Sequence, residues 1–451
     1  MPLFPAEGRQ EGAFVATAGT APARRTAFAP GPHPAPGPGS TQRRPLWRRL
    51  VTIAAIAGPG LIAANAGNDA GGIATYASAG SQFRYRALFI MVLITIGLVV
   101  VQEMSARLGA FTGKGLAALI REEFSIRLAF LALSALLVAN VGIVVSEFAG
   151  IGAAFELFGV SRYISVPVAA VTIWVLVLFG SYRYAERVFL LLSLAFLSYP
   201  IAAVLGHPDW KAVAAATVLP HFVASKAFIL LGVALIGTTI SPYMQLYNAA
   251  AVVDRGIGSA EYPVERVDTV AGAIFADLIS WFIIVATAGA LGGSGVLNSA
   301  KEAAQALRPV AGPAAEVLFG LGLLGASALA GAVVPLSTSY ALAEAIGVER
   351  SVSRSFREAP LFLGLFSAQV LIGALVALVP VNLITLLIGT QVLQGVVTPV
   401  TLVFILVLAN RRSVLGEHAN GPIFKAVAAV AVALVALMAA ALVVITVAGL
   451  F

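Results

Sequence analysis

The chain has 451 residues, of which 59% are hydrophobic and 11% charged, with a net charge of +7 and a mean hydropathy of +0.95. A soluble domain carries roughly 25% charged residues, so this composition excludes an ordinary soluble protein and indicates a surface that mostly faces lipid. Because the sequence has no cysteine, disulfides, thiolate metal sites and cysteine nucleophiles are excluded. The positive charge is better explained by Lys and Arg beside membrane spans than by nucleic-acid binding.

The N-terminal segment, residues 1–46, is rich in Pro, Gly, Ala and Thr and lacks an apolar period, which predicts a disordered cytoplasmic tail. Residues 47–451 contain repeated apolar runs of about 20 residues, the length of a membrane-spanning helix. They predict an all-α, multi-pass domain in the lipid bilayer, with a short surface helix at 299–310. The eleven expected spans are residues 50–79, 87–110, 128–158, 163–180, 186–206, 226–252, 268–292, 313–345, 359–379, 382–409 and 423–448.

Basic residues are distributed unevenly between alternate loops. One set of loops contains Arg107, Lys114, Arg121, Arg127, Arg183, Arg187, Arg255, Arg266, Arg350, Arg354, Arg357, Arg411 and Arg412. The other set contains Arg84, Arg86, Arg162, Lys211, Lys226, Lys301 and Arg308. The asymmetry predicts a cytoplasmic N-terminus and, after eleven crossings, a C-terminus outside the cytoplasmic (inner) membrane.

The first span is interrupted by the stretch NAGNDAGG, residues 65–72. A carboxylate such as Asp69 at the centre of a span costs about 2.5–3.5 kcal/mol unless it is compensated. One interpretation is that Asp69 only caps the second half of a broken helix. The other, which we favour, is that Asp69 is a cation ligand whose charge is balanced by the bound ion.

The sixth span is also interrupted, by GTTISPYMQLYNA at residues 237–249 with Pro242 near its centre. Proline removes a helical hydrogen bond, and unwound backbone is tolerated in lipid only where it faces protein or a watery cavity. Interrupted helices at matching places in two halves indicate the substrate site of an inverted-repeat transporter. The Thr238 carbonyl and the Ser241 hydroxyl would add oxygen ligands to Asp69, and oxygen ligands favour Mg²⁺, Ca²⁺ and Mn²⁺.

Other polar residues lie within the spans. Gln391 in span ten either joins helices or takes part in the ion path, directly or through water. Glu147 in span three is a candidate proton relay, cation attractor or neutral buried acid, and Asp277 in span seven is a candidate supporting residue or a partner for Asn65 or Asn68.

A further pair lies at the inner end of span two. Glu103 and Arg107 are four residues apart, which predicts an ion pair on one helix face.

Three stretches resemble the Nramp family of divalent-metal transporters, over nearly all of residues 50–448. GPGLIAANAGNDAGGIATYASAG at 58–80 is similar to the first-helix motif, QEMSARLGAFTGKGLA at 102–117 to the segment joining helices two and three, and TQVLQGVVTP at 390–399 to the tenth helix. The resemblance places Asp69 on the family's aspartate and Gln391 on its glutamine. It implies a LeuT-type fold with two inverted five-helix repeats, an eleventh helix and unwound helices one and six, working by alternating access.

The departures from the family pattern concern ion ligands and proton carriers. Gly72 stands where the family has an asparagine ligand, and Ser241 where it has the methionine that favours transition metals. Tyr243 and Asn248 replace two histidines that the family links to proton movement, and Val144 replaces an aspartate while Glu147 remains.

This pattern is similar to the Nramp-related magnesium transporters. It implies uptake of Mg²⁺, and also Mn²⁺, as a largely hydrated substrate without tight proton coupling, by a monomer that needs no cofactor. Two alternatives stay open: a proton-coupled Mn²⁺ or Fe²⁺ importer, and, more remotely, an amino-acid permease on the same fold. An enzyme is not expected, since no nucleophile and base pair or HExxH-like motif is present.

Overall fold

The computed structural model describes residues 69–178, 188, 191–192, 194–348 and 356–448. Two predicted features lie outside these residues: the tail at 1–46, and the first part of span one with Asn65 and Asn68. The described residues form helices without β-strands.

Every expected span contains helix in its described part. The helices of the first six spans are α2 (Ala70–Phe83), α3 (Leu88–Thr112), α5 (Ile126–Leu157), α6 (Arg162–Leu178), α8 (Ser198–Leu205), α10 (Lys226–Thr239) and α11 (Pro242–Asp254). Those of the last five are α12 (Tyr262–Leu291), α15 (Ala315–Ile346), α16 (Pro360–Ala377), α17 (Leu383–Asn410) and α19 (Pro422–Val447). Within the described ranges, eight helical segments are long and apolar enough to cross a membrane, and α6 and the 194–205 segment are shorter apolar helices. The chain is therefore a multi-pass membrane protein.

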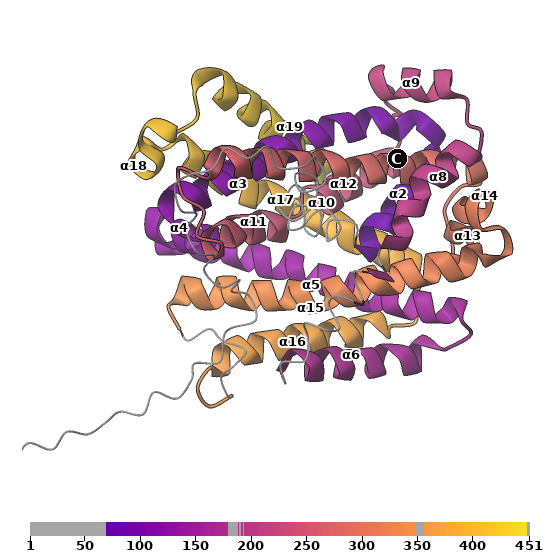
Figure 1. Cartoon of the computed structure of the whole chain (residues 1–451), viewed down its shortest axis with the longest axis horizontal. Coiled ribbons are helices and arrows are strands. Elements are labelled where there is room, and N and C mark those ends of the chain that lie inside the picture. Colours follow the sequence, from indigo (N-terminus) through magenta and orange to yellow (C-terminus); the bar gives the residue numbers. More distant parts are fainter. Residues whose placement is uncertain (1–68, 179–187, 189–190, 193, 349–355, 449–451) are drawn as a thin grey trace, which may run out of the picture.

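Shorter helices lie at the two ends of the bundle. These are α4 (Leu116–Glu123) and α18 (Arg412–Leu415) at one end, and α9 (Trp210–Val218), α13 (Ala300–Ala304) and α14 (Arg308–Ala311) at the other (Figure 1). The expected helix at 299–310 is thus present as α13 and α14, joined by the 3₁₀ turn Gln305–Leu307.

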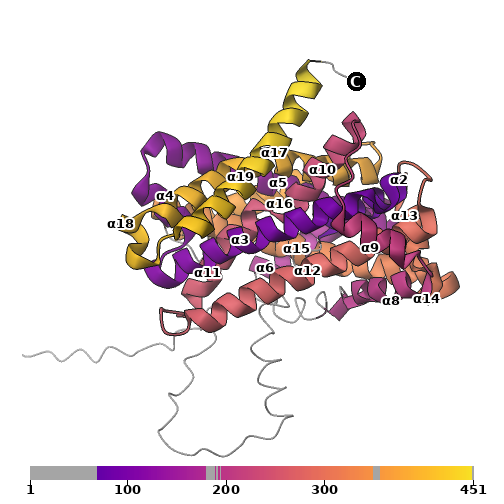
Figure 2. The ribbon, with the colours of Figure 1, turned by 90° about the horizontal axis from the view of Figure 1, so that it is seen from above.

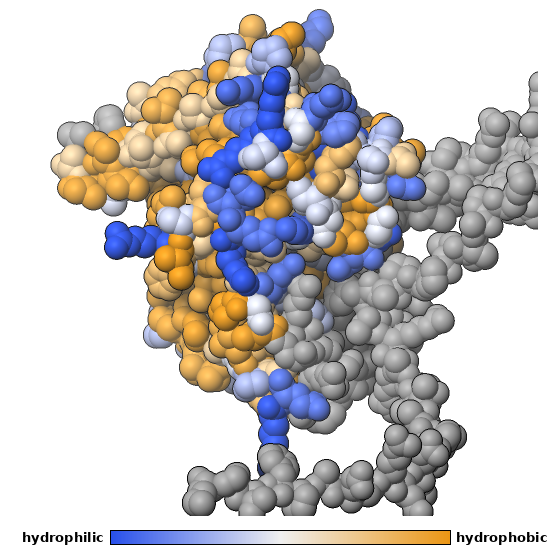
Figure 3. Space-filling model, turned by 90° about the vertical axis from the view of Figure 1, so that its left-hand side faces the viewer, coloured by the Kyte–Doolittle hydropathy of each residue, from blue (hydrophilic) through white to orange (hydrophobic). Residues whose placement is uncertain are grey.

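The long helices run side by side (Figure 1). The end that carries α4, α11 and α18 has a band of hydrophilic residues with apolar residues beside it (Figure 3). The second half of α19 projects from the bundle (Figure 2), and its side chains are largely exposed and apolar. This distribution suits helices whose flanks face lipid.

Helices α10 and α17 meet backbone to backbone. A Cβ placed on Gly237 of α10 would lie 2.0 Å from the carbonyl oxygen of Gln391, and one on Gly395 of α17 would lie 2.1 Å from that of Val233. Small residues permit such close contacts between membrane helices, where there is no hydrophobic driving force from water. The two glycines thereby place the Gln391 turn of α17 directly beside the end of α10.

Candidate ion site

The described chain begins at a helix end buried in the bundle. Asp69 has extended backbone angles (φ −70°, ψ 173°) and caps α2, because its Oδ1 accepts a hydrogen bond of 2.6 Å from the Gly72 N–H. The Ala70 N–H donates to Oε2 of Glu147 on α5 at 3.5 Å. Both carboxyls therefore lie at the positive end of the α2 dipole, where anions are stabilised.

These two acids are almost completely buried, with Asp69 3% and Glu147 0% exposed, and they lie close enough to interact electrostatically. No Lys, Arg or His among the described residues forms an ion pair with either. Oε1 of Glu147 is also buried without a hydrogen-bond partner in the described structure. Buried charges require a partner, so this pair is arranged to receive either a cation or a proton.

The predicted break in span six is present and short. Helix α10 ends at Thr239, α11 begins at Pro242, and Ser241 between them has extended backbone angles (φ −65°, ψ 134°). The residue four positions after Thr238 is Pro242, which has no N–H, so the Thr238 carbonyl lacks the usual helical donor. This carbonyl is consequently available to another partner, and its role as an ion ligand stays a prediction.

The break in span six meets the start of α2 at Thr238. The Thr238 hydroxyl faces the Asp69 carboxyl. A Cβ placed on Gly72 would lie 2.6 Å from Thr238 Oγ1 and 3.1 Å from Asp69 Oδ1. Gly72 therefore leaves room between Asp69 and the end of α10 that a larger residue would fill.

Helix α17 contributes two amides to this region. The Ser241 hydroxyl donates to Oε1 of Gln394 at 2.7 Å, and Nε2 of Gln394 donates to Oε1 of Gln391 at 3.0 Å. Nε2 of Gln391 is buried without a partner in the described structure and lies 1.8 Å from where a Gly71 Cβ would be. The structure thus brings Gln391 to the start of α2 but directs its carbonyl oxygen toward Gln394.

Sequence reasoning missed Gln394, although it lies three residues after Gln391 and therefore on the same helix face. It also missed Ser146 on α5 and Ser327 on α15, whose buried hydroxyls lack hydrogen-bond partners in the described part of the chain. Ser146 Oγ lies 2.6 Å from the position of a Gly71 Cβ, and Ser327 Oγ 2.4 Å from that of a Gly150 Cβ. Together with the two carboxyls, these unpartnered hydroxyls form a set of hard oxygen ligands.

The described residues hold no group of three or more His, Cys, Asp or Glu side chains that would ligate a metal. A cation at this site would be held by Asp69 and by neutral oxygen atoms, or through waters that such atoms bind. That arrangement differs from a cage of several carboxylates or imidazoles.

A family model described as "Natural resistance-associated macrophage protein-like", or Nramp, matches residues 60–445. The chain belongs to the Nramp family. It is 31% identical over 414 residues to the "Divalent metal cation transporter MntH" of Ralstonia nicotianae, covering 85% of this chain and 88% of that protein. The MntH of Aeromonas hydrophila is 28% identical over 390 residues, with 84% and 92% of the two chains covered. These relatives are named as transporters, not enzymes.

Solved structures give the same fold. The manganese transporter of Eremococcus coleocola superposes with a TM-score of 0.72 at 19% identity, over 89% of this chain and 87% of that one. The nucleobase-cation-symport family transporter Mhp1 gives a TM-score of 0.52 at 15% identity, over 86% and 93% of the two chains. The predicted LeuT-type fold of inverted five-helix repeats with an eleventh helix is therefore confirmed.

The remaining predicted residues of this Nramp chain lie at different distances from the α2 start. Tyr243, in the first turn of α11, is buried and interacts electrostatically with both Asp69 and Glu147. Asn248, one turn further along α11, donates instead to the backbone carbonyl of Gln102 on α3 at 3.0 Å.

Asp277 lies on α12, which packs against α2. It is buried near Thr95 of α3, and its Oδ2 has no hydrogen-bond partner in the described structure. Tyr76 of α2 interacts with Asp277 and shares a hydrogen bond of 2.9 Å with Thr239 Oγ1. A supporting position for Asp277 is consistent with these contacts, whereas its predicted amide partners Asn65 and Asn68 are outside the described residues.

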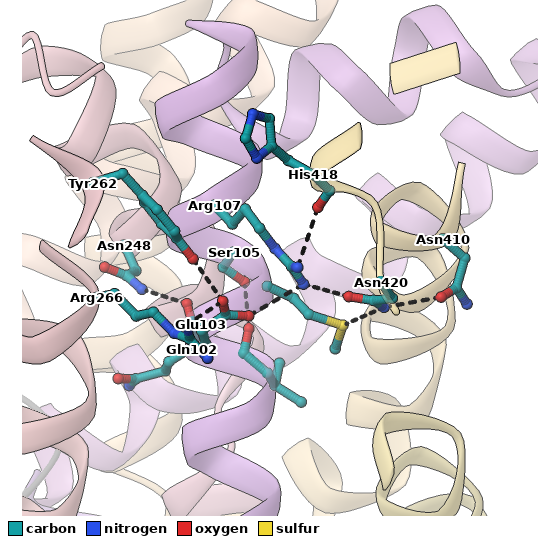
Figure 4. Close-up of polar contacts among 12 residues, drawn as sticks. Gln102, Glu103, Ser105, Arg107, Asn248, Tyr262, Arg266, Asn410, His418 and Asn420 are labelled. Carbon is teal, nitrogen blue, oxygen red and sulfur yellow. Dashed lines mark hydrogen bonds and ion pairs between the residues drawn. The ribbon is translucent and has the colours of Figure 1, made fainter. Parts of the chain in front are cut away.

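A second polar cluster lies at the end of the bundle where α3 finishes and α12 begins (Figure 4). The predicted pair of Glu103 and Arg107 is confirmed at 3.2 Å, but it is not a simple surface pair, because Glu103 is buried. Glu103 also accepts a hydrogen bond of 2.6 Å from the Tyr262 hydroxyl and pairs with Arg266 at 3.4 Å, both on α12. Arg107 in turn donates to the side chain of Asn420, just before α19.

Proposed function

We propose that this Nramp-family chain is a divalent-cation transporter that takes up Mg²⁺, and also Mn²⁺, as a largely hydrated ion by alternating access. The MntH relatives, which are divalent metal cation transporters by name, support the substrate class. The observation that carries the proposal is the pair of buried carboxyls, Asp69 and Glu147, beside hydroxyl and amide groups and without a basic partner among the described residues. Such hard donors suit Mg²⁺ and Mn²⁺.

The preference for a hydrated ion rests on the groups that face Asp69. Ser241 has no sulfur to favour a transition metal, and Gly72 has no side chain to ligate any metal. With Asp69, Ser241 and the Thr238 carbonyl as direct ligands, and Gln391 beside them, most of the coordination sphere is left to water. Mg²⁺ gives up its water reluctantly and commonly binds proteins through one or two carboxylates.

Transport without tight proton coupling rests on the same region. Tyr243 and Asn248 occupy the positions of the family's two histidines, and Val144 that of its aspartate. The membrane potential would still drive uptake. A divalent ion that moves inward gains about 4.6 kcal/mol per 100 mV, which sustains a gradient of roughly three decades.

The proposed setting is the cytoplasmic (inner) membrane, with the polar end of Figure 3 in the cytoplasm, the N-terminus on that side and the C-terminus outside. Arg121 of α4, Arg255 directly after α11, and Arg411 and Arg412 at α18 support this orientation. One chain supplies every group of the proposed site, so a monomer would suffice. The ion is a substrate, and no cofactor is required.

The decisive experiment is Mg²⁺ uptake into proteoliposomes by the wild type, Asp69→Asn and Asp209→Asn. Asparagine caps helices as well as aspartate does, so Asp69→Asn keeps the cap on α2 but removes the charge. Asp209 is the matched control, because it caps α9 at the exposed end of the bundle. We expect uptake by the wild type and Asp209→Asn, and at least a tenfold loss in Asp69→Asn, since one hydrogen bond or ligand to a charged group contributes about 1.5–3 kcal/mol.

Full uptake by Asp69→Asn would reduce Asp69 to a helix cap and refute the proposed site. Acidification of the vesicle lumen in step with Mn²⁺ uptake, without Mg²⁺ uptake, would establish the proton-coupled alternative. Uptake of amino acids would establish the permease, although Asp69 would repel a substrate carboxylate.

A further inference from the structure

Helix α17 carries a hydrogen-bond relay toward the ion site, and its central member is Gln394. This side chain is completely buried. It accepts the Ser241 hydroxyl hydrogen through Oε1 and donates through Nε2 to Oε1 of Gln391. The three residues are thus linked in one direction, from the break in span six to the start of α2.

The backbone around the relay is held firmly. The close contact of Gly237 with the Gln391 turn fixes α17 against α10. The Thr398 hydroxyl donates to the backbone carbonyl of Gln394 at 2.8 Å and approaches that of Ile240, in the break, at 3.5 Å. With the two backbones in close contact at this level, the orientation of the amides decides which atoms face the ion site.

The direction of the relay gives each end a different chemical character. Since the Ser241 hydrogen is donated to Gln394, the lone pairs of Ser241 Oγ are left for another partner. At the other end, Oε1 of Gln391 already accepts from Gln394, and its Nε2 is the atom that lies beside Gly71. An N–H group does not ligate a cation, so Gln391 does not present an oxygen ligand in this arrangement.

From this geometry we infer that Gln394 is a positioning residue that determines ion selectivity by withholding the Gln391 carbonyl oxygen from the ion. The inference rests on the proposed function and deepens it. With one oxygen ligand withheld, the ion keeps one more water, which favours Mg²⁺ over an ion that loses water more readily. Nothing in the resemblance to Nramp motifs assigns a role to residue 394.

The inference is tested with purified full-length protein in nanodiscs and proteoliposomes. In Gln394→Leu, the Gln391 amide loses its donor and is free to turn its oxygen toward the ion. We expect the ratio of Mn²⁺ to Mg²⁺ affinity to rise about tenfold, the effect of one hydrogen bond or ligand to a charged group. We also expect bound Mn²⁺ to carry one water fewer by electron–nuclear double resonance in deuterated solvent.

Two further variants separate positioning from a merely structural role. In a Gln391→Leu background, Gln394→Leu should leave the Mn²⁺ to Mg²⁺ ratio unchanged, because its effect acts through Gln391. Gln369 on α16 is a matched control: it is buried and donates to Pro335 O at 3.2 Å and Ser339 Oγ at 3.3 Å. Gln369→Leu should lower stability without altering the ratio. Gln394→Met, which keeps the length of the side chain, serves if Gln394→Leu does not fold.

The outcomes distinguish the two proposals. If the wild type takes up no Mg²⁺, the proposed function fails and the inference with it. If the wild type takes up Mg²⁺ but Gln394→Leu changes neither the ratio nor the water count, the inference alone fails. It also fails if the ratio changes equally in the Gln391→Leu background.

Discussion

The space beside Gly72 allows a quantitative test of the site with the smallest possible change. Gly72 is in the first turn of α2, where replacing glycine by alanine ordinarily stabilises a helix by about 0.5–1 kcal/mol. Here the added Cβ would lie 2.6 Å from Thr238 Oγ1, closer than real Cβ atoms approach a neighbour. Overpacking of this kind costs about 1–3 kcal/mol, so we expect Gly72→Ala to destabilise the protein by about 1 kcal/mol overall.

The same clash should affect transport, because Thr238 is displaced from the Asp69 carboxyl. If the displacement costs about 1 kcal/mol of ion binding, the KM for Mg²⁺ uptake rises about fivefold, since 1.4 kcal/mol corresponds to a factor of ten. Adding Thr238→Ala removes the clashing oxygen. The double variant should regain or exceed wild-type thermal stability, while its KM stays raised if Thr238 Oγ1 itself assists binding.

Thermal unfolding in detergent and Mg²⁺ uptake in proteoliposomes measure the two effects separately. Gly389→Ala on α17 is the matched control, because a Cβ there would meet no atom within 4 Å. It should be neutral or slightly stabilising and leave uptake unchanged. A Gly72→Ala variant with the stability and KM of the wild type would refute the reasoning, because the α2 start and Thr238 would then be free to separate.

Three other changes have defined outcomes. Glu147→Gln removes one of two buried carboxyls beside the ion, and we expect at least a tenfold weaker Mg²⁺ affinity by calorimetry with the fold intact; unchanged affinity would place Glu147 outside the site. Gly237→Ala forces α10 away from the Gln391 carbonyl and should lower thermal stability by about 1–3 kcal/mol, an effect that a variant melting like the wild type would contradict. Glu103→Gln leaves Arg107 without its buried charge partner and should cost about 3–5 kcal/mol of unfolding free energy, whereas a loss below 1 kcal/mol would mean that solvent already screens the cluster.

Much of the architecture follows from local sequence patterns. Apolar runs of membrane length predicted every span that the structure describes as helix, because hydropathy and backbone hydrogen bonding leave few alternatives in lipid. The break in span six was also predictable, since Pro242 removes a backbone donor and leaves the Thr238 carbonyl without one. Asp69 was recognised because a mid-span carboxylate is costly and therefore rarely incidental.

The rest of the site depends on how helices are rotated about their axes, which a single sequence does not specify. Ser146 and Ser327 are ordinary small polar residues in long apolar helices until Gly71 and Gly150 bring the neighbouring backbone against them. The direction of the Gln391 amide depends on Gln394 and on the span-six break together. Whether Gln391 turns its amide oxygen or its amide nitrogen toward the ion site therefore depends on three-dimensional contacts, which sequence spacing alone does not supply.

The roles predicted for Asn248 and Asp277 remain predictions. Asn248 donates to the α3 backbone, whereas Asp277 lies near Thr95 of α3 with its Oδ2 unpartnered in the described structure. The five residues that separate Asn248 from Tyr243 turn its side chain to another face of α11, toward the α3 backbone.

The polar cluster of Figure 4 restricts the movements that transport requires. Glu103 is buried between a guanidinium of its own helix and the Tyr262 and Arg266 side chains of α12, while Arg107 reaches the segment before α19. Sliding α3 along α12 would separate the buried Glu103 carboxylate from Tyr262 and Arg266, and would leave Arg107 of its own helix as its charge partner. Because that movement would remove two of the three partners of a buried carboxylate, we expect α3 and α12 to move together. We therefore expect a passage to this side of the membrane to open along a different contact, where α11 packs against α5 and α15.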